Sequence, residues 1–241
     1  MVDVKPGRPI SCRGRSTPAA DRLQVGEKRK LTRLRSDLLN WARQAGRVYP
    51  WRANAASSYE RIVVEVLLQR TTVTAVSKFY DAFFSRFPTW EALALAQPED
   101  LATFLKPLGL WRKRAASLLG LAKYAISVSG QFPHNPRERR KIPAIGQYVS
   151  SAIALFQYGE PAPLLDVNMS RVIERFIHPR SRADIRHDPW LRDAAFWFAR
   201  GPQPEMANWA ILDFAALVCK SRRPRCSECP VRPRCNYVRS K

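Results

Sequence analysis

Acidic side chains are scarce in this chain of 241 residues, which carries 20 Asp and Glu against 41 Lys and Arg. The resulting formal net charge of +21 says nothing about the fold, but it favours a polyanionic partner, either nucleic acid or an anionic membrane surface. No apolar run approaches the roughly 20 residues that a membrane span needs, and the N-terminus lacks the apolar core of a signal peptide. We therefore expect a cytoplasmic protein that associates with nucleic acid and not with membranes.

Patterns typical of β-strands are also missing. Apolar residues instead recur at helical spacing, in short segments separated by turns that contain Pro and Gly. The sequence therefore predicts an all-α protein, with short helices opened by Thr89 and Pro98 and others over residues 30–44, 59–70, 74–87, 111–130, 136–141, 147–157, 168–177, 190–199 and 204–219. Residues 1–29 lack periodicity and carry scattered Arg, Pro and Gly, which is typical of a flexible basic arm. The arm could track DNA phosphates or be an artefact of the assigned start site, and its Cys12 receives no role.

The stretch from Ile142 to Asp166 is the one around which the chain is organised. A turn with Pro143 and Gly146 leads directly into a helix, and Asp166 follows two leucines just past that helix. Amide groups at a helix N-terminus have no intrahelical acceptor and attract anions, phosphates above all. A carboxylate near such a phosphate anchor suits chemistry on nucleic acid, whereas the alternative is an ordinary helix start followed by a solvated Asp.

Glu65 interrupts the otherwise apolar helix predicted over residues 59–70. At helical spacing Arg61, Glu65 and Gln69 fall on one face of that helix. Two interpretations remain open, an internal Arg61–Glu65 ion pair or a pocket that Glu65 and Gln69 line together. Asp213, a second carboxylate on a helix expected to be buried, is interpreted as structural, with backbone amides as its expected partners.

Four cysteines near the C-terminus give the most specific pattern in the chain. Cys219, Cys226, Cys229 and Cys235 follow a Cys-x6-Cys-x2-Cys-x5-Cys spacing. In a cytosolic chain such density indicates a metal site and not a set of disulfides. Zinc ribbons usually pair two Cys-x2-Cys knuckles, and this chain has only one, so the spacing favours a [4Fe–4S] cluster. The arginines between these cysteines could present a basic surface to phosphates or simply be solvated.

Together, the hairpin, the aspartate beyond it and the cysteine pattern resemble the helix–hairpin–helix (HhH-GPD, endonuclease III-like) DNA glycosylase superfamily, in particular its thymine-mismatch and adenine branches. Three segments carry the resemblance further, namely Tyr49–Arg52, Val64–Thr71 and Leu165–Asn168. The family fold implies two helical lobes with the flipped base between them. One lobe would span residues 57–165, and the other would combine 30–56 with 166–241, including the cluster loop at 219–235.

The resemblance also implies roles for single residues. Asp166 would be the catalytic carboxylate that stabilises positive charge on the sugar, with Glu65 and Tyr148 beside it. A lysine at position 148 would form a Schiff base with the sugar, so Tyr148 predicts a monofunctional hydrolase that leaves an abasic site. The residues expected to contact DNA are Gln69, Arg70 and Leu110, which would fill the vacated space or read the orphan base, and the amides of Gly146 and Gln147. Core packing is the alternative for Leu110.

Three departures from the family pattern concern the substrate more than the fold. Ala144 replaces the first Gly of the hairpin and would strain a turn that needs a positive φ by about 1 kcal/mol. Val167 replaces a common Gly, and Ser170 stands where a basic residue is frequent. The first hypothesis is a monomeric enzyme that removes thymine or uracil opposite guanine in double-stranded DNA. The alternatives are an adenine glycosylase acting opposite guanine or 8-oxoguanine, a non-catalytic iron–sulfur DNA-binding regulator, or an enzyme with a modified pyrimidine as its target.

Overall fold

The computed structural model describes residues 22–142 and 145–240, and within these ranges the chain forms helices and no strand, so the all-α prediction is confirmed. No helix in the described ranges has the length and apolar character that crossing a membrane would require. The α-helices in chain order are α1 (Val25–Ala45), α2 (Ser58–Leu67), α3 (Val73–Arg86), α4 (Trp90–Ala94), α5 (Pro98–Phe104), α6 (Trp111–Ser127), α7 (Pro136–Arg139), α8 (Gln147–Tyr158), α9 (Val167–Phe176), α10 (Pro189–Ala199), α11 (Pro204–Leu217) and α12 (Asn236–Arg239). Short 3-10 turns occur at η2 (Pro50–Arg52), η3 (Lys106–Leu108) and η4 (Arg232–Arg234).

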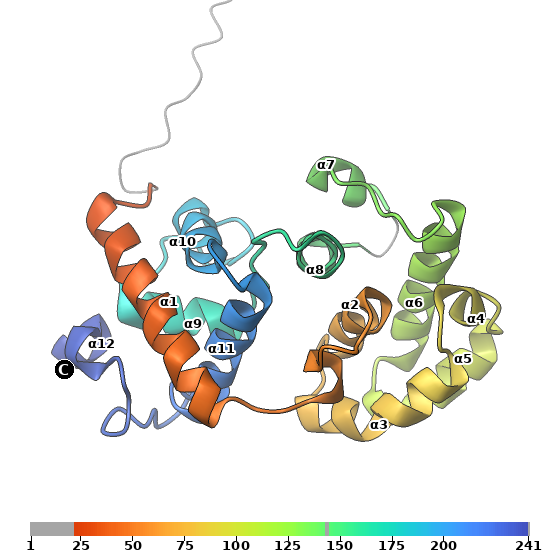
Figure 1. Cartoon of the computed structure of the whole chain (residues 1–241), viewed down its shortest axis with the longest axis horizontal. Coiled ribbons are helices and arrows are strands. Elements are labelled where there is room, and N and C mark those ends of the chain that lie inside the picture. Colours follow the sequence, from red (N-terminus) through yellow and green to blue (C-terminus); the bar gives the residue numbers. More distant parts are fainter. Residues whose placement is uncertain (1–21, 143–144, 241) are drawn as a thin grey trace, which may run out of the picture.

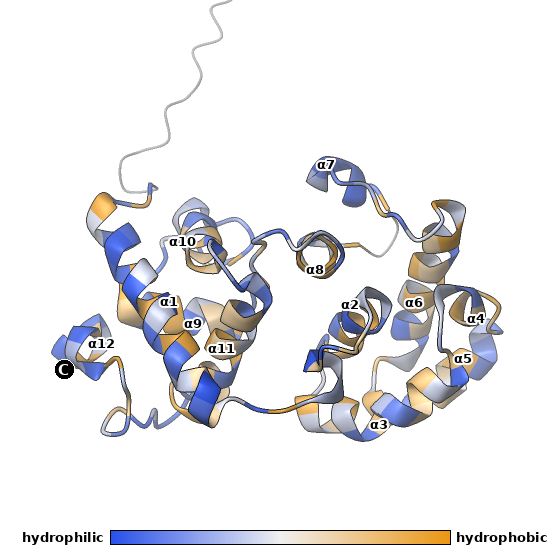
Figure 2. Ribbon diagram, viewed as in Figure 1, coloured by the Kyte–Doolittle hydropathy of each residue, from blue (hydrophilic) through white to orange (hydrophobic). Residues whose placement is uncertain are grey.

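Two hydrophobic cores divide these helices into two groups that lie side by side in Figure 1. We call the group α2–α8 lobe A and the group α1 with α9–α12 lobe B. Apolar helix faces turn inward in each lobe, while the outer faces are polar (Figure 2). Trp209 of α11 packs into the core of lobe A, and α8 contacts α11. The two lobes therefore meet along α8 and α11.

Helix α1 begins at Val25, five residues before the start that the sequence pattern predicts. A capping box formed by Gln24 and Glu27 satisfies the first amides of this helix. The indole of Trp197 also donates a hydrogen bond to the carbonyl of Lys28 at 3.0 Å. Residues 25–29 are therefore helical and not part of a flexible arm. The rest of the predicted arm, residues 1–21 with Cys12, lies outside the described residues.

Helix α2 ends at Leu67, three residues before the predicted end at Arg70. Leu68 to Arg70 form a turn, in which Arg70 has a φ of 55°. Gln69 therefore does not share a helix face with Glu65, and this part of the prediction is wrong. Helical periodicity could not show the end, because the carbonyls at the end of α2 accept hydrogen bonds from Arg114 of α6, 47 and 48 residues further along the chain.

Asp213 of α11 binds residues of the segment between α1 and α2, which connects lobe B to lobe A. Its carboxylate is almost fully buried and accepts hydrogen bonds from the main-chain amide of Arg47 at 2.8 Å and from the guanidinium of Arg52 at 2.7 and 3.0 Å. The side chain of Arg47 completes the cluster at 2.7 Å. The predicted structural role agrees with this arrangement, but only one backbone amide takes part and two arginines supply the other donors.

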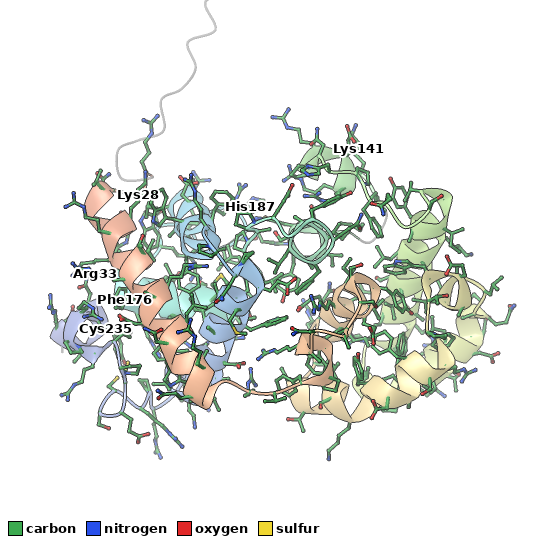
Figure 3. The ribbon with its side chains drawn as sticks, in the orientation of Figure 1. Lys28, Arg33, Lys141, Phe176, His187 and Cys235 are labelled. Carbon is green, nitrogen blue, oxygen red and sulfur yellow. The ribbon has the colours of Figure 1, made fainter. Side chains whose placement is uncertain are left out.

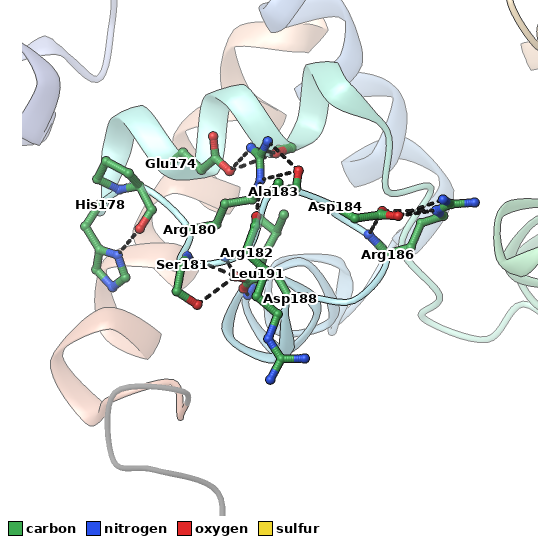
Figure 4. A network of polar contacts seen from close by, with 12 residues as sticks. Glu174, His178, Arg180, Ser181, Arg182, Ala183, Asp184, Arg186, Asp188 and Leu191 are labelled. Atoms are coloured by element: carbon green, nitrogen blue, oxygen red, sulfur yellow. Dashed lines mark hydrogen bonds and ion pairs between the residues drawn. The ribbon is translucent and has the colours of Figure 1, made fainter.

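A second buried carboxylate, Asp188, orders the loop between α9 and α10 (Figure 4). Its Oδ1 accepts the amide of Leu191 at 2.7 Å and so caps α10. Its Oδ2 accepts the amides of Ser181 and Arg182 at 3.0 and 2.9 Å. This one side chain therefore fixes both a helix start and the polar loop before it.

Candidate active site and cysteine cavity

Asp166 is the N-cap of α9, at the point where the chain enters lobe B from α8. One carboxylate oxygen accepts the main-chain amides of Asn168 and Met169 at 2.9 and 2.8 Å, and the other accepts the side-chain amide of Asn168 at 2.6 Å. Arg171 holds Asn168 in turn at 3.1 Å and bonds the carbonyl of Cys219 at 2.9 Å. These donors fix the orientation of the carboxylate, although Asp166 remains partly exposed.

Glu65 and Tyr148 form a hydrogen-bonded pair between α2 and α8. The phenol of Tyr148 donates to the carboxyl of Glu65 at 2.7 Å, and Glu65 is only 3% exposed. Burial raises the pKa of Glu65 to about 7; the bond from Tyr148 and the charge of Arg52 oppose this rise, whereas Asp166 adds to it. Burial and the charges of Glu65 and Asp166 raise the pKa of Tyr148 well above its usual value. Tyr148 therefore stays a protonated donor at neutral pH.

The internal Arg61–Glu65 ion pair, one of the two interpretations of this helix, is not formed. Arg61 instead reaches Glu205 at the start of α11, at 3.0 and 3.1 Å. This pair crosses from lobe A to lobe B and leaves Glu65 free to face Tyr148. Arg52 is the residue near Glu65 that sequence reasoning missed, although it lies in the Tyr49–Arg52 segment and its charge acts on the Glu65 carboxyl.

The elevated pKa of Glu65 predicts a pH-dependent stability. The carboxyl is protonated more readily in the folded protein than in the unfolded chain, so its ionisation destabilises the folded protein as the pH rises from about 4.5 to about 7. Glu65→Gln keeps an acceptor for Tyr148 and removes this ionisation. We expect the free energy of unfolding of the variant, relative to the wild type, to increase by roughly 3 kcal/mol between pH 5 and pH 8, at 1.36 kcal/mol per pKa unit. Urea unfolding at both pH values measures this difference.

Glu60 on the same helix provides a matched control for this measurement. Burial opposes the change, but hydrogen bonds from Tyr80 and Ser57 lower the pKa of Glu60 overall. The ionised Glu60 carboxylate therefore stabilises the folded protein throughout pH 5 to 8, and this contribution is lost only at lower pH. Glu60→Gln should shift stability by a constant amount between pH 5 and pH 8, and an equally flat result for Glu65→Gln would contradict the prediction.

Gln69, Arg70 and Leu110 lie on two turns at the surface of lobe A. Gln69 and Arg70 are exposed, and Leu110 is 50% exposed directly before α6. Leu110 has a φ of 48°, in the left-handed region that apolar residues rarely occupy. Core packing of Leu110, the alternative interpretation, is therefore wrong.

The amides at the start of α8 belong to the predicted phosphate anchor. Gly146 is exposed and is the N-cap of this helix, and Gln147 is its first residue. Gly146 has a φ of −77°, so a positive φ is not its role here. Pro143 and Ala144 lie outside the described residues, and the strain expected at Ala144 is a prediction about that part of the chain.

The four cysteines of the C-terminal pattern line one small cavity. None of the four forms a disulfide, and all four are partly exposed. Arg175 of α9 approaches the sulfur of Cys219 at 3.5 Å, and the thiol of Cys235 donates to the carbonyl of Arg175 at 3.4 Å. The remaining lining is largely apolar and includes Phe176, labelled with Cys235 in Figure 3, together with Val172, Phe214, Val218, Pro224, Val231, Tyr237 and Val238. Within the described ranges, no three His, Cys, Asp or Glu side chains converge closely enough to hold a single metal ion.

The sequence and the structure of this chain are similar to those of known DNA repair proteins. The family model for HhH-GPD superfamily base excision DNA repair proteins matches residues 63–186. A thymine-DNA glycosylase of Aeropyrum pernix is 34% identical over 88% of this chain and 96% of its own length. A thymine/uracil-DNA glycosylase of Pyrobaculum aerophilum is 35% identical over 83% of this chain and 89% of its own. The solved structure of a thermostable thymine-DNA glycosylase superposes with a TM-score of 0.79 at 29% identity, over 88% of this chain and 98% of that one.

Proposed function

Since the chain belongs to the HhH-GPD superfamily of base excision DNA repair proteins, we propose that it is a monofunctional DNA glycosylase that releases thymine or uracil paired with guanine. The observation that carries this proposal is the arrangement of Asp166 beside the buried Glu65–Tyr148 pair, at the meeting of the two lobes. The thymine and uracil substrates named for the similar enzymes favour a pyrimidine over adenine. The enzyme would act as a monomer, with the flipped base bound between lobes A and B.

Asp166 would stabilise the transition state electrostatically. Breaking the bond between the base and C1′ of the sugar develops positive charge on the sugar, and water then adds to C1′. A fixed carboxylate near that carbon favours the charged transition state without having to reorganise. The N–H donors on both oxygens of Asp166 supply that fixed orientation.

Glu65 would donate or accept a proton during base release. A pKa of about 7 allows it to exist in both protonation states near neutral pH, which suits a general acid or base. It could give a proton to the leaving base or accept one from the attacking water. Tyr148, which stays protonated, would hold the Glu65 carboxyl in place by its hydrogen bond.

Binding would extract the target base from the duplex, because an active site of this kind cannot reach a stacked base. Leu110 would enter the vacated space as an apolar wedge, while Gln69 and Arg70 on the neighbouring turn would contact the orphan base. The amides of Gly146 and Gln147 would grip a phosphate next to the flipped nucleotide.

One panel of end-labelled duplexes tests the activity and its target. The duplexes carry T·G, U·G, A·G, A·8-oxoguanine and a set of oxidised or modified pyrimidines, and each is incubated with and without subsequent alkali. We expect base release from T·G and U·G, seen as strand cleavage after alkali. Release of adenine alone would indicate the adenine-specific alternative, and tight binding without release from any duplex would indicate a non-catalytic DNA-binding protein.

Tyr148 should determine whether the enzyme also cleaves the strand. A tyrosine has no amine, so we expect wild-type enzyme to nick DNA only after alkali. Tyr148→Lys introduces an amine that can form a Schiff base with C1′ of the sugar, and we expect some cleavage without alkali, together with a covalent adduct trapped by borohydride. Tyr148→Phe serves as the control that gains no adduct. A trapped adduct with the wild-type enzyme would point to another amine.

The four cysteines would hold a [4Fe–4S] cluster, and the cavity fits this group. Such a cluster binds four thiolates on four different irons, so its ligands surround a shared space and do not converge on one ion. Cys219, Cys226, Cys229 and Cys235 form no disulfide and line one largely apolar cavity, which suits this requirement. The cluster would order the loop and so present its arginines to DNA phosphates. Arg175, which bonds the carbonyls of Lys220 and Ser221 at 2.7 and 2.9 Å, would hold the loop against α9.

Metal analysis tests the cofactor directly. Protein purified anaerobically should be brown, absorb at about 400 nm and contain about four irons per chain. Cys226→Ser removes one ligand and should lower the iron content, whereas Cys12→Ser should leave the spectrum unchanged because Cys12 lies outside the four-cysteine pattern. Stoichiometric zinc without iron would rule out the cluster.

A further inference from the structure

Arg114 in the first turn of α6 is buried, at 5% exposure, and every hydrogen bond that the structure gives it runs to a main-chain carbonyl. Its two terminal nitrogens donate to Val66 and Leu67 at 2.9 Å each and to Gln69 and Leu108 at 3.1 and 3.3 Å. The remaining nitrogen, Nε, donates to Gly109 at 3.4 Å. One guanidinium therefore joins two separate turns.

These two turns carry the exposed residues proposed to enter DNA. The first turn follows α2 and contains Arg70, and the second joins η3 to α6 and contains Leu110. Both residues have left-handed backbone conformations, with φ values of 55° and 48°. Such conformations are strained for residues other than glycine and persist only where the surrounding structure holds them. Arg114 bonds the residue directly before each of them, Gln69 and Gly109.

We propose that Arg114 is a positioning residue that locks the two turns into one rigid unit, so that Arg70 and Leu110 enter DNA at a fixed separation and the base opposite the target is recognised. This inference rests on the proposed glycosylase function. Arginine suits the role because its five N–H groups form a planar fork that can serve several carbonyls in different directions. Lysine keeps the charge but offers three donors from a single nitrogen, which cannot hold both turns at once.

If Arg114 has this positioning role, its substitution should reduce the preference for T·G over T·A duplexes and not only the amount of folded protein. For Arg114→Lys, single-turnover release from T·G should slow by between about 10- and 100-fold, the scale of a displacement of about 1 Å at an active site. The ratio of rates for T·G over T·A should fall as well. A purely structural role would lower the active fraction equally on every duplex and leave that ratio unchanged. Rates are therefore compared at a temperature where each variant is folded.

Arg139→Lys is the matched control. Arg139 is also buried in lobe A and donates to the main-chain carbonyls of Pro133 and His134 at 2.9 and 2.8 Å, but it touches neither turn. The Arg139→Lys variant should keep the wild-type ratio of release rates for T·G over T·A. In a double-mutant cycle, Leu110→Ala should cost less in the Arg114→Lys background than in the wild type, because the wedge is already misplaced. Additive effects with an unchanged ratio would overturn the proposal.

Amide hydrogen exchange separates this proposal from the proposed function. Arg114→Lys should increase exchange at both turns, residues 67–71 and 108–112, whereas Arg139→Lys should affect neither. If the wild type releases no base from any duplex but both turns loosen together, the glycosylase assignment fails while the locking of the turns stands. If only one turn or neither loosens, the locking itself is wrong, whatever the activity.

Discussion

Asp166→Asn should retain DNA binding and lose base release by at least roughly 10²-fold, the scale of removing one key electrostatic group from an active site. The substitution is conservative in shape, and an asparagine oxygen can still accept the amides of Asn168 and Met169 that Asp166 caps. Asn and Asp are comparable N-caps, so helix α9 should keep its start. What disappears is the negative charge proposed to face the sugar, together with the acceptor for the side-chain amide of Asn168. Single-turnover release from a T·G duplex and binding to a duplex with an abasic-site analogue measure the two effects separately.

Asp188→Asn is the control that this chain offers. Asp188 also caps a helix and accepts three main-chain amides, but it lies at the start of α10 and orders the loop behind it. It should lower thermal stability and leave release per folded molecule near the wild-type rate. If Asp166→Asn releases base at the wild-type rate, the catalytic carboxylate lies elsewhere, and Glu65 becomes the first candidate.

Asp213→Ala should lower the free energy of unfolding by about 3–5 kcal/mol, the usual cost of removing one partner from a buried ion pair. Asp213 is 1% exposed and holds both Arg47 and Arg52 at 2.7 Å. Truncation leaves the Arg52 guanidinium largely desolvated and without its counter-charge. It also releases the linker between the lobes, because the amide of Arg47 loses its acceptor. Urea unfolding at pH 7 measures the change.

Asp184→Ala provides the comparison for this loss. Asp184 pairs with Arg186 at 2.6 Å, yet both side chains are exposed, and exposed pairs contribute little to stability. We expect no measurable change in the urea midpoint. A loss for Asp213→Ala no larger than that for Asp184→Ala would mean that water reaches Arg52 and replaces the carboxylate.

Helical periodicity predicts most of this fold because each helix buries one apolar face. For two of the boundaries that differ from the prediction, the start of α1 and the end of α2, the structure shows the cause. α1 begins early since Gln24 and Glu27 cap it and Trp197 packs on its first turn, and α2 ends early since Arg114 takes its last carbonyls. Neither effect leaves a periodic signal in the local sequence.

The candidate site shows the same division. A carboxylate on a buried apolar helix had to face a polar partner, so Glu65 could be singled out from the sequence. Periodicity could not pair it with Tyr148, which lies 83 residues away on another helix; only the family resemblance named both residues for one site. The roles of Arg52 and Arg114 were also missed. In a chain with many arginines, the sequence does not show which of them the fold buries. The cysteine spacing, by contrast, is local, and the four thiols do line one cavity.

The route of the chain through lobe B has a consequence for biosynthesis. α1 packs against α10 and α11, which lie well over 100 residues later in the chain. Its apolar face, which includes Leu31, Leu34 and Leu38, is therefore synthesised long before α10 and α11, the helices that cover it. At 5–20 residues per second the delay is on the order of ten seconds. Most of lobe A is synthesised in the meantime, but Trp209 of α11 belongs to its core as well, so both hydrophobic cores stay incomplete until α11 has emerged.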